Sequence, residues 1–565
     1  MKKNFIIAAG DTGMRCLQSF INMCALGMYP DEEIHILLLE TDIENGDKKE
    51  SEKLVNWFQS LNESSGGTKK GSDAPKCRRF FNVDIHFHVF VPDYSQDSKR
   101  RFTLISELEK GGSELNRQLA NQFYSEDVQE FDLMHGFRAQ THLGSYLMYH
   151  AFIEELKLAT ASDIYRDTSD LYKFMTEIVG ANKEGEARVF VLGSSFGGTG
   201  ASSIPVMSRA IQDGAEILVD GSIRMENIFF GAVVLTPYFK FKSASKEHKK
   251  NEKVVADSVF FQHNSAAALM YYIKDHTLLT TYKNFYLLGW PFTPSDVDDY
   301  KAQVNGDNKG KTVTGGKKQK NPAHLVEFLS AFAARNFFFG ADDETLRSRH
   351  EAEWRYKAIP FETENDTKIP YFAFDDVVTE KSNKGTEEDI SKALKDRLTC
   401  LYAFGMYLHG SHDGSIEGFL DNLQRYNVTY DLSKVQIEAL DGYLNYLTAH
   451  IEDDKVIPGW LPQMWYSLGE RNTNGEFLGY VADGLDLHIG NSKIPTDLFP
   501  KMYRDLVNRS TKSIMHTLIS RWLKLGVSAG RSKRKGEIGV FFDDLLNVMS
   551  SFEVNSVEDK EKETR

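Results

Sequence analysis

Short, continuous runs of hydrophobic residues alternate with amphipathic segments along the first 240 residues of the chain. The runs cover residues 4–9, 34–39, 83–91, 189–192 and 228–235. A strand that is hydrophobic on both faces is typical of a parallel sheet covered by helices on both sides, because neither face meets water. Helical spacing of hydrophobic residues between the runs supplies the covering helices. The pattern predicts an α/β fold with a doubly wound, mostly parallel sheet.

A later segment is hydrophobic almost all round. It starts at Asn321, a good N-cap residue, and Pro322 suits the first helical position. Seven large hydrophobic residues follow between Leu325 and Phe338. A helix without a polar face must be buried. We therefore expect a core helix over residues 321–340.

The remaining chain has a different character. Two strand-like stretches, 356–361 and 369–374, precede helical patterns at residues 390–408, 415–426, 434–451, 498–525 and 539–550. We expect an α/β domain over residues 1–320, the core helix over 321–340, a helix-rich domain over 341–553 and a disordered tail over 554–565. Two polar, glycine-rich stretches, 62–76 and 305–320, are expected to be loop insertions.

Charge and composition narrow the class of protein. The 565 residues carry 67 basic and 81 acidic side chains, a net charge of −14. This balance argues against general binding to nucleic acid or anionic membranes, which needs a basic surface. The longest strongly hydrophobic stretch has twelve residues, 228–239, whereas a spanning helix needs about twenty. We expect no membrane span and no signal peptide, because the first hydrophobic run stops at Asp11.

The cysteines indicate the cellular compartment. Cys16, Cys24, Cys77 and Cys400 form no CxxC pair and no metal-ligand spacing. A disulfide framework is therefore not expected, and a reducing, cytoplasmic location is.

The chemistry with the clearest pattern lies in residues 188–210. A hydrophobic strand leads into a turn with glycines at 193, 197, 198 and 200, and a helix is expected from about Ser202, with Pro205 in its first turn. Glycines let the backbone approach a phosphate closely, and the N-terminus of the helix attracts the anion. A tight strand-to-helix connection without a ligand would use the same residues, so both interpretations stay open.

Two common nucleotide motifs are absent. The dinucleotide fingerprint GxGxxG fails after the first strand, where Gly10 and Gly13 have no third glycine at the required spacing. A P-loop needs four residues between its first glycine and the sequence GK[ST]. Gly306 and the Gly310 of GKT have only three residues between them. Both motifs are excluded.

The glycine-rich turn itself resembles a known family. Residues 196–202, FGGTGAS, are similar to the tubulin/FtsZ signature GGGTG[ST]G, with Phe196 in place of the first glycine and Ser202 in place of the last. Four further segments resemble the family in the same order: 6–17 (IIAAGDTGMRCL), 37–42 (LLLETD), 231–241 (GAVVLTPYFKF) and 321–332 (NPAHLVEFLSAF). The resemblance covers roughly residues 4 to 350.

The resemblance implies a site for GTP or GDP with Mg²⁺. The residues that it assigns to the α- and β-phosphates are Gly197, Gly198, Thr199 and Gly200, with Ala201 and Ser202 at the start of the helix; Gly10, Asp11, Thr12 and Gly13 form the opposite wall. Asp42 would reach Mg²⁺ or ribose, and Gly136 and Arg138 would contact the γ-phosphate. Asp11 is equally suited to capping a helix, Asp42 to starting a turn and Arg138 to an ordinary surface loop.

Sugar and base recognition depart from the family pattern. The family's base-contacting asparagine aligns with Ala323, so Asn321 becomes the candidate for the base. The glutamate that follows Pro237 in FtsZ is replaced by Lys240 and Lys242, which leaves Glu247 or Glu252 as acidic substitutes. The choice between guanine and adenine therefore stays open, and ATP is not excluded.

Three acids follow the expected core helix: Asp342, Asp343 and Glu344. In the family, the loop at this position enters the nucleotide pocket of the next subunit, where its acid positions the attacking water. The resemblance implies that one of these acids is catalytic in trans. A solvated acidic turn that caps the next helix is the alternative.

Three functions fit these residues. The first is a GTPase that assembles head to tail into a filament, with itself as partner. The second is a nucleotide-binding scaffold or switch in a bacterial multiprotein system such as defence or partitioning, which contacts other proteins through the C-terminal helical domain and forms no filament. The third is an unrelated α/β nucleotide-binding enzyme.

Other constellations predict less. His86 and His88 share one face of a strand, and His409 and His412 one face of a helix, but neither pair has an evident carboxylate or cysteine co-ligand. No metal-ligand site is predicted from protein side chains. The basic cluster 531–535 is expected to be a solvated turn.

Overall fold

The computed structural model describes most of the first 357 residues and shorter stretches after them. The described residues are 2–30, 33–42, 44–62, 80–92, 114–130, 136–241, 254, 256–290, 295–296, 321–340, 343–357, 379–381, 387–389, 397–398, 400–402, 404–405, 408, 415–452, 455–466, 469–471, 477–480, 488–489, 492–493, 519–520, 522–524, 535–536 and 538–550.

The chain forms two compact units. The first comprises Met1–Phe20, Glu33–Lys53 and Ile85–Ala373, and the second comprises Ile21–Glu32, Leu54–Asp84 and Phe374–Arg565. Each unit is assembled from separate stretches of the chain. The domain limits at residues 320, 340 and 553 stay predictions.

The first unit contains the sheet and its covering helices. Its strands are β1 (Lys2–Ala9), β2 (Glu33–Leu39), β3 (Asp84–Phe90), β4 (Glu186–Ser194), β5 (Ile228–Leu235), β6 (Phe239–Lys240), β7 (Tyr282–Leu288), β8 (Ser295–Asp296) and β9 (Glu353–Lys357). Its helices are α1 (Gly10–Ala25), α2 (Gly46–Asn62), α4 (Glu114–Phe123), α5 (Glu126–Glu130), α6 (Thr141–Ala161), α7 (Asp163–Thr168), α8 (Asp170–Glu184), α9 (Thr199–Val219), the 3-10 helix η2 (Ser258–Phe260), α11 (Phe261–Tyr272), α12 (His276–Thr281), α14 (Leu325–Phe339) and α15 (Asp343–Ser348). The C-terminal ends of α1 and α2 belong to the second unit.

Seven strands form one sheet in the order β3-β2-β1-β4-β5-β7-β9. β1 pairs in parallel with β2 and β4, and the pairs β4–β5, β5–β7 and β7–β9 are also parallel. The predicted α/β class with a mostly parallel sheet is confirmed. The chain runs outward from β1 to β2 and β3, then returns to β4 on the other side of β1. The carboxyl ends of β1 and β4 are therefore a topological switch point, where open α/β sheets place ligands.

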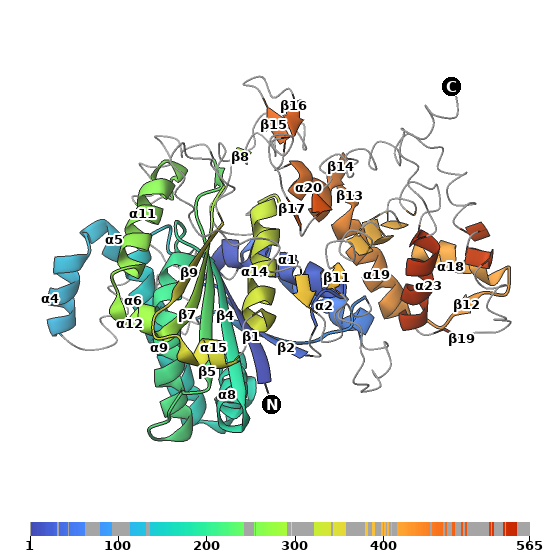
Figure 1. Cartoon of the computed structure of the whole chain (residues 1–565). Helices are drawn as coiled ribbons and strands as arrows, with labels where there is room; N and C mark the ends of the chain where they lie inside the picture. The colour runs from blue at the N-terminus through green and yellow to red at the C-terminus, as the bar shows by residue number, and fades with distance from the viewer. Residues whose placement is uncertain are drawn as a thin grey trace. The chain divides into compact units, whose positions relative to one another are not determined.

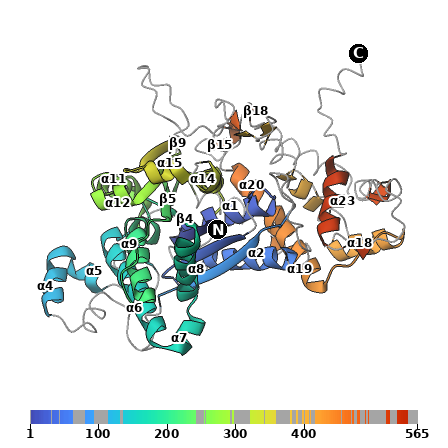
Figure 2. The same cartoon turned by 60° about the horizontal axis from the view of Figure 1, so that its bottom comes forward.

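Helices cover both faces of this sheet, as Figures 1 and 2 show. Inward side chains of β1, β2, β4 and β5 pack with those of α6, α8 and α9 in one core cluster. On the opposite face, the ring of Phe337 in α14 lies 5.4 Å from that of Phe190 in β4. A Cβ at Gly231 in β5 would lie 2.7 Å from the Phe337 ring, so a glycine there lets α14 approach the sheet. All residues from Leu325 to Phe338 are buried, as expected for a core helix.

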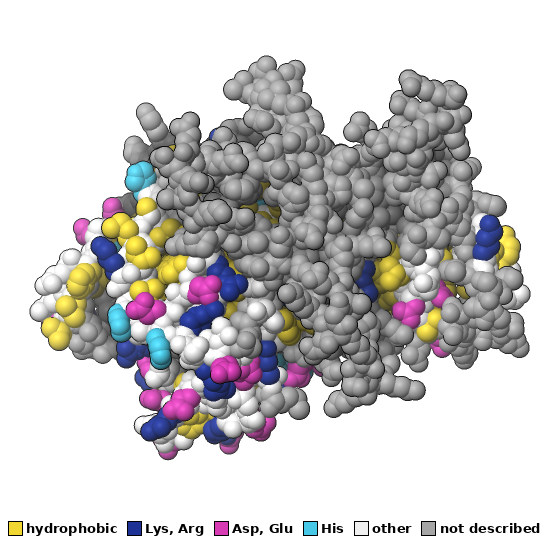
Figure 3. Space-filling view, viewed as in Figure 1, with side chains coloured by type: hydrophobic (Ala, Val, Ile, Leu, Met, Phe, Trp, Pro, Cys, Tyr) yellow, Lys and Arg dark blue, Asp and Glu magenta, His cyan; other side chains and the backbone are white. Residues whose placement is uncertain are grey.

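One short helix of the first unit keeps a hydrophobic face exposed. Leu115, Leu119 and Phe123 recur at four-residue spacing on α4, and Leu115 and Phe123 are 65% and 71% exposed. Figure 3 shows hydrophobic side chains at this edge of the molecule. The amphipathic pattern of α4 is therefore not used for burial among the described residues.

The second unit combines helices with short strand pairs. Its elements are β10 (Thr379–Lys381), β11 (Glu387–Asp389), α18 (Ile416–Gln424), β12 (Thr429–Tyr430), α19 (Lys434–Leu447), β13 (Ala449–Glu452), β14 (Lys455–Pro458), α20 (Trp460–Tyr466), β15 (Gly469–Arg471), β16 (Phe477–Tyr480), β17 (His488–Ile489), β18 (Ser492–Lys493), β19 (Lys535–Gly536) and α23 (Ile538–Ser550). Aromatic rings form much of its core: Trp522 lies 5.2 Å from Phe419 and 5.4 Å from Phe541. The helical predictions at 415–426, 434–451 and 539–550 correspond to α18, α19 and α23.

Several expectations meet the structure only in part. The strand expected at 356–361 is β9, which begins earlier, at Glu353; residues 358–361 lie outside the described residues. Residues 305–320, 369–374 and 554–565, and most of 62–76 and 498–525, also lie outside them. Within the described part of the chain, no helix is long and hydrophobic enough to cross a membrane. The three cysteines described, Cys16, Cys24 and Cys400, are buried and free of disulfides.

Candidate functional site

A cleft opens at the carboxyl ends of β1, β2 and β4, at the switch point of the sheet. Most of the residues that the sequence assigns to a nucleotide line this cleft together: Gly10, Asp11, Thr12, Asp42, Gly136, Arg138, Gly197, Gly198, Thr199, Gly200 and Asn321. Gly13, Ala201 and Ser202 do not line it. Segments more than 300 residues apart in sequence thus meet at one place.

The turn from β1 into α1 depends on two glycines. Gly10 has φ of +70°, and a Cβ there would lie 2.9 Å from the Thr199 Cβ and 3.1 Å from the Gly200 nitrogen. A Cβ at Gly13 would lie 2.6 Å from the Leu192 carbonyl oxygen. Real Cβ atoms do not approach so closely, and only glycine tolerates this φ without strain. The two glycines let the β1 and β4 turns lie against each other.

The turn from β4 leads directly into α9. The helix begins at Thr199, with Gly198 as N-cap, so the expected start near Ser202 is wrong by one turn. Pro205 consequently lies inside the helix instead of in its first turn. Proline cannot donate to the carbonyl four residues earlier; that carbonyl, on Ala201, accepts a hydrogen bond from the Tyr272 hydroxyl at 2.7 Å. This side-chain bond makes the internal proline tolerable.

The early start of α9 matters for chemistry. The first backbone N–H groups of a helix have no partner within it and carry partial positive charge. Thr199 and Gly200, which carry two of these groups, line the cleft. Ser202 is buried, and its hydroxyl donates to the Thr199 carbonyl at 2.9 Å. The N-terminus of α9 is therefore suited to an anion, while the Ser202 side chain supports the helix.

A third loop, Gly136–Gln140, lies against the same turn. Its residues Gly136, Arg138 and Ala139 all have positive φ, at 82°, 45° and 64°. For non-glycine residues this conformation is costly and is often found at functional sites. A Cβ at Gly198 would lie 3.1 Å from the Ala139 nitrogen, so the loops are in close contact. Arg138 faces the cleft, but its Nη1 also donates to the Val254 carbonyl at 2.8 Å.

Carboxylates form the wall beside β2. Glu40, which the sequence analysis did not single out, accepts hydrogen bonds from the backbone N–H of Thr41 at 2.6 Å and of Asp42 at 3.1 Å. Asp42 is buried and accepts from the Glu44 N–H at 3.0 Å. Asp11 accepts from the Asn45 side chain. Burial, followed by the nearby charge of Asp11, raises the pKa of Glu40 to about 8.

This pKa predicts a pH dependence of stability. Glutamate in the unfolded chain titrates near pH 4.5, and Glu40 in the folded protein near pH 8. Between these values the folded state binds more protons, so the contribution of Glu40 to the free energy of unfolding falls as pH rises through this window. Urea unfolding of the nucleotide-free and metal-free protein at several pH values should show a shallower fall in Glu40→Gln. The exposed control Glu351→Gln should keep the wild-type slope; an equal slope in Glu40→Gln would contradict this assignment.

The opposite wall is aromatic. Phe196, Phe239, Phe241 and Phe261 line the cleft, and Phe261 lies 4.8 Å from Phe196 and 5.5 Å from Phe241 between ring centres. Phe196 belongs to the glycine turn itself, whereas Phe239 of β6, Phe241 after β6 and Phe261 of α11 adjoin this turn only in the folded chain. The cleft thus has a polar end with backbone donors and acids, and an apolar end suited to a flat ring.

A buried ion-pair network supports this end of the cleft. Arg15 of α1 donates from Nε to Glu327 at 2.6 Å and from Nη2 to the Tyr238 hydroxyl at 2.7 Å, and that hydroxyl donates to Glu327 at 2.5 Å. Arg15 is 3% exposed and Glu327 1%. The Arg15 guanidinium also lies 5.1 Å from the centre of the Phe239 ring. The network joins α1, the β5–β6 connection and α14.

Removing the cation from this network should be costly. Arg15→Met leaves the Glu327 carboxylate buried without its counter-charge, which typically costs about 3–5 kcal/mol. Urea unfolding should show this loss. The control Arg224→Met removes an arginine that is 90% exposed, and it should change the free energy of unfolding by less than about 0.5 kcal/mol. Equal stability of Arg15→Met and the wild type would show that the network is not structural.

The start of α14 corrects one expectation. The N-cap is His324, not Asn321, and Pro322 precedes the helix. The His324 Nδ1 accepts from the Val326 N–H at 3.2 Å, while Glu327 accepts from the His324 N–H at 3.0 Å. This reciprocal capping box satisfies two N–H groups, which an Asn321 cap could not do at that spacing. Asn321 is left at the cleft, where the sequence analysis placed it for the base.

The described acids after α14, Asp343 and Glu344, lie in α15 near the amino end of β4, opposite the cleft. The Asp343 carboxylate forms an ion pair with Arg188 near the start of β4, and Arg188 also donates to the Phe337 and Phe338 carbonyls at 3.0 and 2.9 Å. Glu344 is exposed, and Asp342 lies outside the described residues. The amino end of β4 therefore carries Asp343, and its carboxyl end adjoins the cleft.

Comparison with known proteins was made at the level of families, curated sequences and solved structures. No model of a known protein family matches the chain, and no curated protein does. Among solved structures it is similar to CetZ2 from Haloferax volcanii, determined as a GTPγS-bound protofilament, with 14% sequence identity and a TM-score of 0.25. The match covers 62% of this chain and 64% of that chain, less than two thirds of the latter's length. The α/β class described above rests on strand order and pairing.

Most of the candidate residues for contacting the ribose lie outside the described residues. Lys240 is exposed on β6, whereas Lys242, Glu247 and Glu252 lie outside the described residues. His409 and His412 and residues 531–534 do as well. Arg15, Glu40 and the aromatic wall were not predicted from the sequence. Glu40 had a local signal, because it is the first residue after a buried strand that ends at the cleft; Arg15 and the phenylalanines had none.

Proposed function

We propose that this chain is a divergent tubulin/FtsZ-like protein that binds GTP or GDP with Mg²⁺ in the cleft. The observation that supports the proposal most is the meeting of two glycine-dependent turns and a third strained loop at the switch point of a parallel sheet. Each comes from a segment that resembles the corresponding phosphate loop of the family. A tight turn without a ligand explains each one singly, but not their convergence on an open cleft.

The chemistry of the cleft fits a nucleotide polyphosphate. Backbone N–H groups at the start of α9 and the positive end of its dipole would receive the phosphates. The carboxylates of Asp11 and Asp42 would repel bare phosphate, so a cation between them is required, and Glu40 beside them adds a further oxygen donor. Their oxygen donors fit Mg²⁺, which usually binds one or two carboxylates together with phosphate oxygens and water. Phe239, Phe241 and Phe261 would then face the base, with Asn321 as its hydrogen-bonding partner.

The position of the acids supports hydrolysis between copies. Arg188, which holds Asp343, and Ser194 at the cleft are six residues apart on β4, or about 20 Å along the strand. Asp343 and Glu344 therefore cannot reach a nucleotide in their own chain. A second copy stacked along the strand direction would bring them to the cleft, where an acid can orient water against a bound γ-phosphate. Such a heterologous contact repeats into a filament.

Nucleotide binding can be measured directly on the full chain. Titration calorimetry with GTP, GDP and ATP in the presence of Mg²⁺ should show saturable binding near one equivalent, with GTP and GDP tighter than ATP. Chelation of the metal should weaken binding, because the acidic wall then opposes the phosphates. Absence of binding by all three nucleotides at millimolar concentration would refute the proposed function, and tighter binding of ATP would refute the choice of base.

A non-hydrolysing nucleotide switch is the second candidate. It is favoured by the ion pair of Asp343 with buried Arg188, since a carboxylate held in this way is a structural partner. In that case the protein binds nucleotide, but neither turns it over nor sediments as filaments. The two candidates share the cleft and differ in what the acids do.

A further inference from the structure

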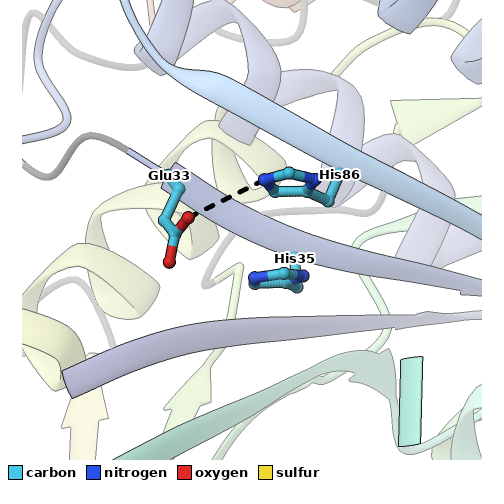
Figure 4. Close-up of side chains that lie close together, drawn as sticks. All are labelled: Glu33, His35 and His86. Carbon is cyan, nitrogen blue, oxygen red and sulfur yellow. Dashed lines mark ion pairs between the residues drawn. The ribbon is translucent and has the colours of Figure 1, made fainter. Parts of the chain in front are cut away.

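A group of metal-ligating side chains lies away from the cleft, at the amino ends of β2 and β3. Glu33 and His35 are two residues apart on β2 and therefore point to the same face of the sheet. His86 comes from β3, the neighbouring strand in the sheet. One ligand atom of each of the three residues lies within 4.8 Å of those of the other two. Figure 4 shows the carboxylate and the two imidazole rings gathered between the strands.

His86 and His88 are two residues apart on β3 and form the pair that the sequence pattern suggests. The sheet supplies different partners: His86 Nε2 lies 3.8 Å from the Glu33 carboxylate, and its ring stacks on that of His35 at 4.5 Å. His88 lies instead against Phe174 of α8, at 5.8 Å between ring centres. Residues far apart in sequence thus form a two-histidine, one-carboxylate group that spacing within one strand does not reveal.

The hydrogen-bonding groups of the buried His35 ring point to a ligand. Its side chain is 3% exposed, and neither ring nitrogen has a hydrogen-bond partner among the residues that the structure describes. A buried polar group left unsatisfied costs about 1–3 kcal/mol. The ring is held between Phe5, at 5.0 Å, and His86, so it cannot turn to solvent. A metal ion bound through one nitrogen would satisfy this group where no atom of the described residues does.

The surroundings admit an ion. The Glu33 and His86 side chains are 33% and 41% exposed, so an ion can enter from solvent and keep a water ligand. Ligand nitrogens around a tetrahedral ion lie about 3.3 Å apart for bonds near 2.0 Å, and small rotations of these two exposed side chains would bring the atoms together. Lys3 lies 3.6 Å from Glu33 but donates to Glu177 at 2.8 Å, so it keeps a partner when Glu33 turns to the ion.

We propose that Glu33, His35 and His86 bind a divalent transition-metal ion such as Zn²⁺ or Co²⁺, which links edge strand β3 to β2. Imidazole ligands select this class of ion over Mg²⁺ and Ca²⁺, which prefer oxygen donors. Three protein ligands leave one position open for water, as in many exchangeable zinc sites. The site shares no residue with the cleft and is independent of the proposed nucleotide function.

The metal alone provides the test. Co²⁺ titrated into the metal-free full chain should produce visible absorption bands that saturate at one equivalent and are displaced by Zn²⁺, and Zn²⁺ should raise the melting temperature. His86→Gln and Glu33→Gln alter half-exposed side chains, so both variants should fold and bind Co²⁺ at least tenfold more weakly. His35→Phe should abolish the bands.

Exposed His263 on α11 provides the matched control, and His263→Gln should bind as the wild type does. No saturable Co²⁺ bands in the wild type, or wild-type affinity in both His86→Gln and Glu33→Gln, would overturn the site. Displacement of the bands by Mg²⁺ as readily as by Zn²⁺ would overturn the proposed class of ion.

Discussion

Replacing Asp342 and Asp343 together by asparagine should abolish GTP turnover and leave nucleotide binding intact. Asp343 begins α15 beside Arg188 at the amino end of β4, whereas the cleft lies at the carboxyl end, so Asp343 cannot contact a nucleotide bound to its own chain. Asp342 directly precedes it in the sequence. A group that orients or deprotonates the attacking water typically contributes about 10²–10⁴ to the rate. Phosphate release from the double variant should fall by roughly that factor, whereas the calorimetric affinity for GTP should stay within about twofold.

Single variants separate chemistry from structure. Asp343→Asn breaks the ion pair with Arg188, which is 1% exposed, and should lower the free energy of unfolding as well as affect turnover. Glu344→Gln changes an exposed acid and should report on turnover alone. Asp167→Asn, an exposed aspartate on α7, is the control. Wild-type turnover in the double variant would remove Asp342 and Asp343 from the mechanism.

Replacing Gly10 by alanine should abolish nucleotide binding by closing the cleft at its base. The positive φ alone costs a non-glycine residue about 1–2 kcal/mol, and the added Cβ would lie 2.9 Å from the Thr199 Cβ and 3.1 Å from the Gly200 nitrogen. The β1 and β4 turns must separate to relieve the clash, which displaces the N–H groups at the start of α9. We expect a loss of affinity of roughly 10²-fold or more, the effect of about 3 kcal/mol.

Gly180 of α8 is the matched control. A Cβ there meets no atom of the described residues within 4 Å, so Gly180→Ala should bind nucleotide normally and gain about 0.5–1 kcal/mol of stability from higher helix propensity. Circular dichroism distinguishes a folded Gly10→Ala protein from an unfolded one. A folded Gly10→Ala variant with wild-type affinity would place the nucleotide elsewhere.

The hydrophobic pattern predicted the part of the sheet that is buried on both faces. The five hydrophobic runs correspond to β1 to β5. Positions such as Ile36 and Val191 are fully buried in the sheet and accept only hydrophobic residues. β7 escaped prediction because Lys283 and Asn284 interrupt its run; the structure satisfies Asn284 with Arg349. β9 alternates charged and aromatic residues at the edge of the sheet and was expected only from Tyr356 onward. Edge positions carry weaker hydrophobic signals than central ones.

In the candidate site, too, some residues could be predicted from the sequence and others could not. The glycines at 10, 197, 198 and 200 were predicted, because close backbone approach restricts the residue type within a few positions. Arg15 was not, since its partners Glu327 and Tyr238 are more than 200 residues away in sequence, and an isolated arginine on a helix has no distinctive pattern. The His324 cap was missed because histidine is an uncommon N-cap residue, whereas Asn-Pro is a frequent helix start. Long-range pairing, and not local propensity, decides these positions.

The most direct test of the account is the specific rate of GTP turnover measured over increasing concentrations of the full chain. A cleft completed by the acids of a second copy predicts that phosphate release rises more than linearly with protein concentration, together with sedimentable assemblies in GTP and Mg²⁺. A specific rate that is independent of concentration, from protein that remains monomeric, would contradict it.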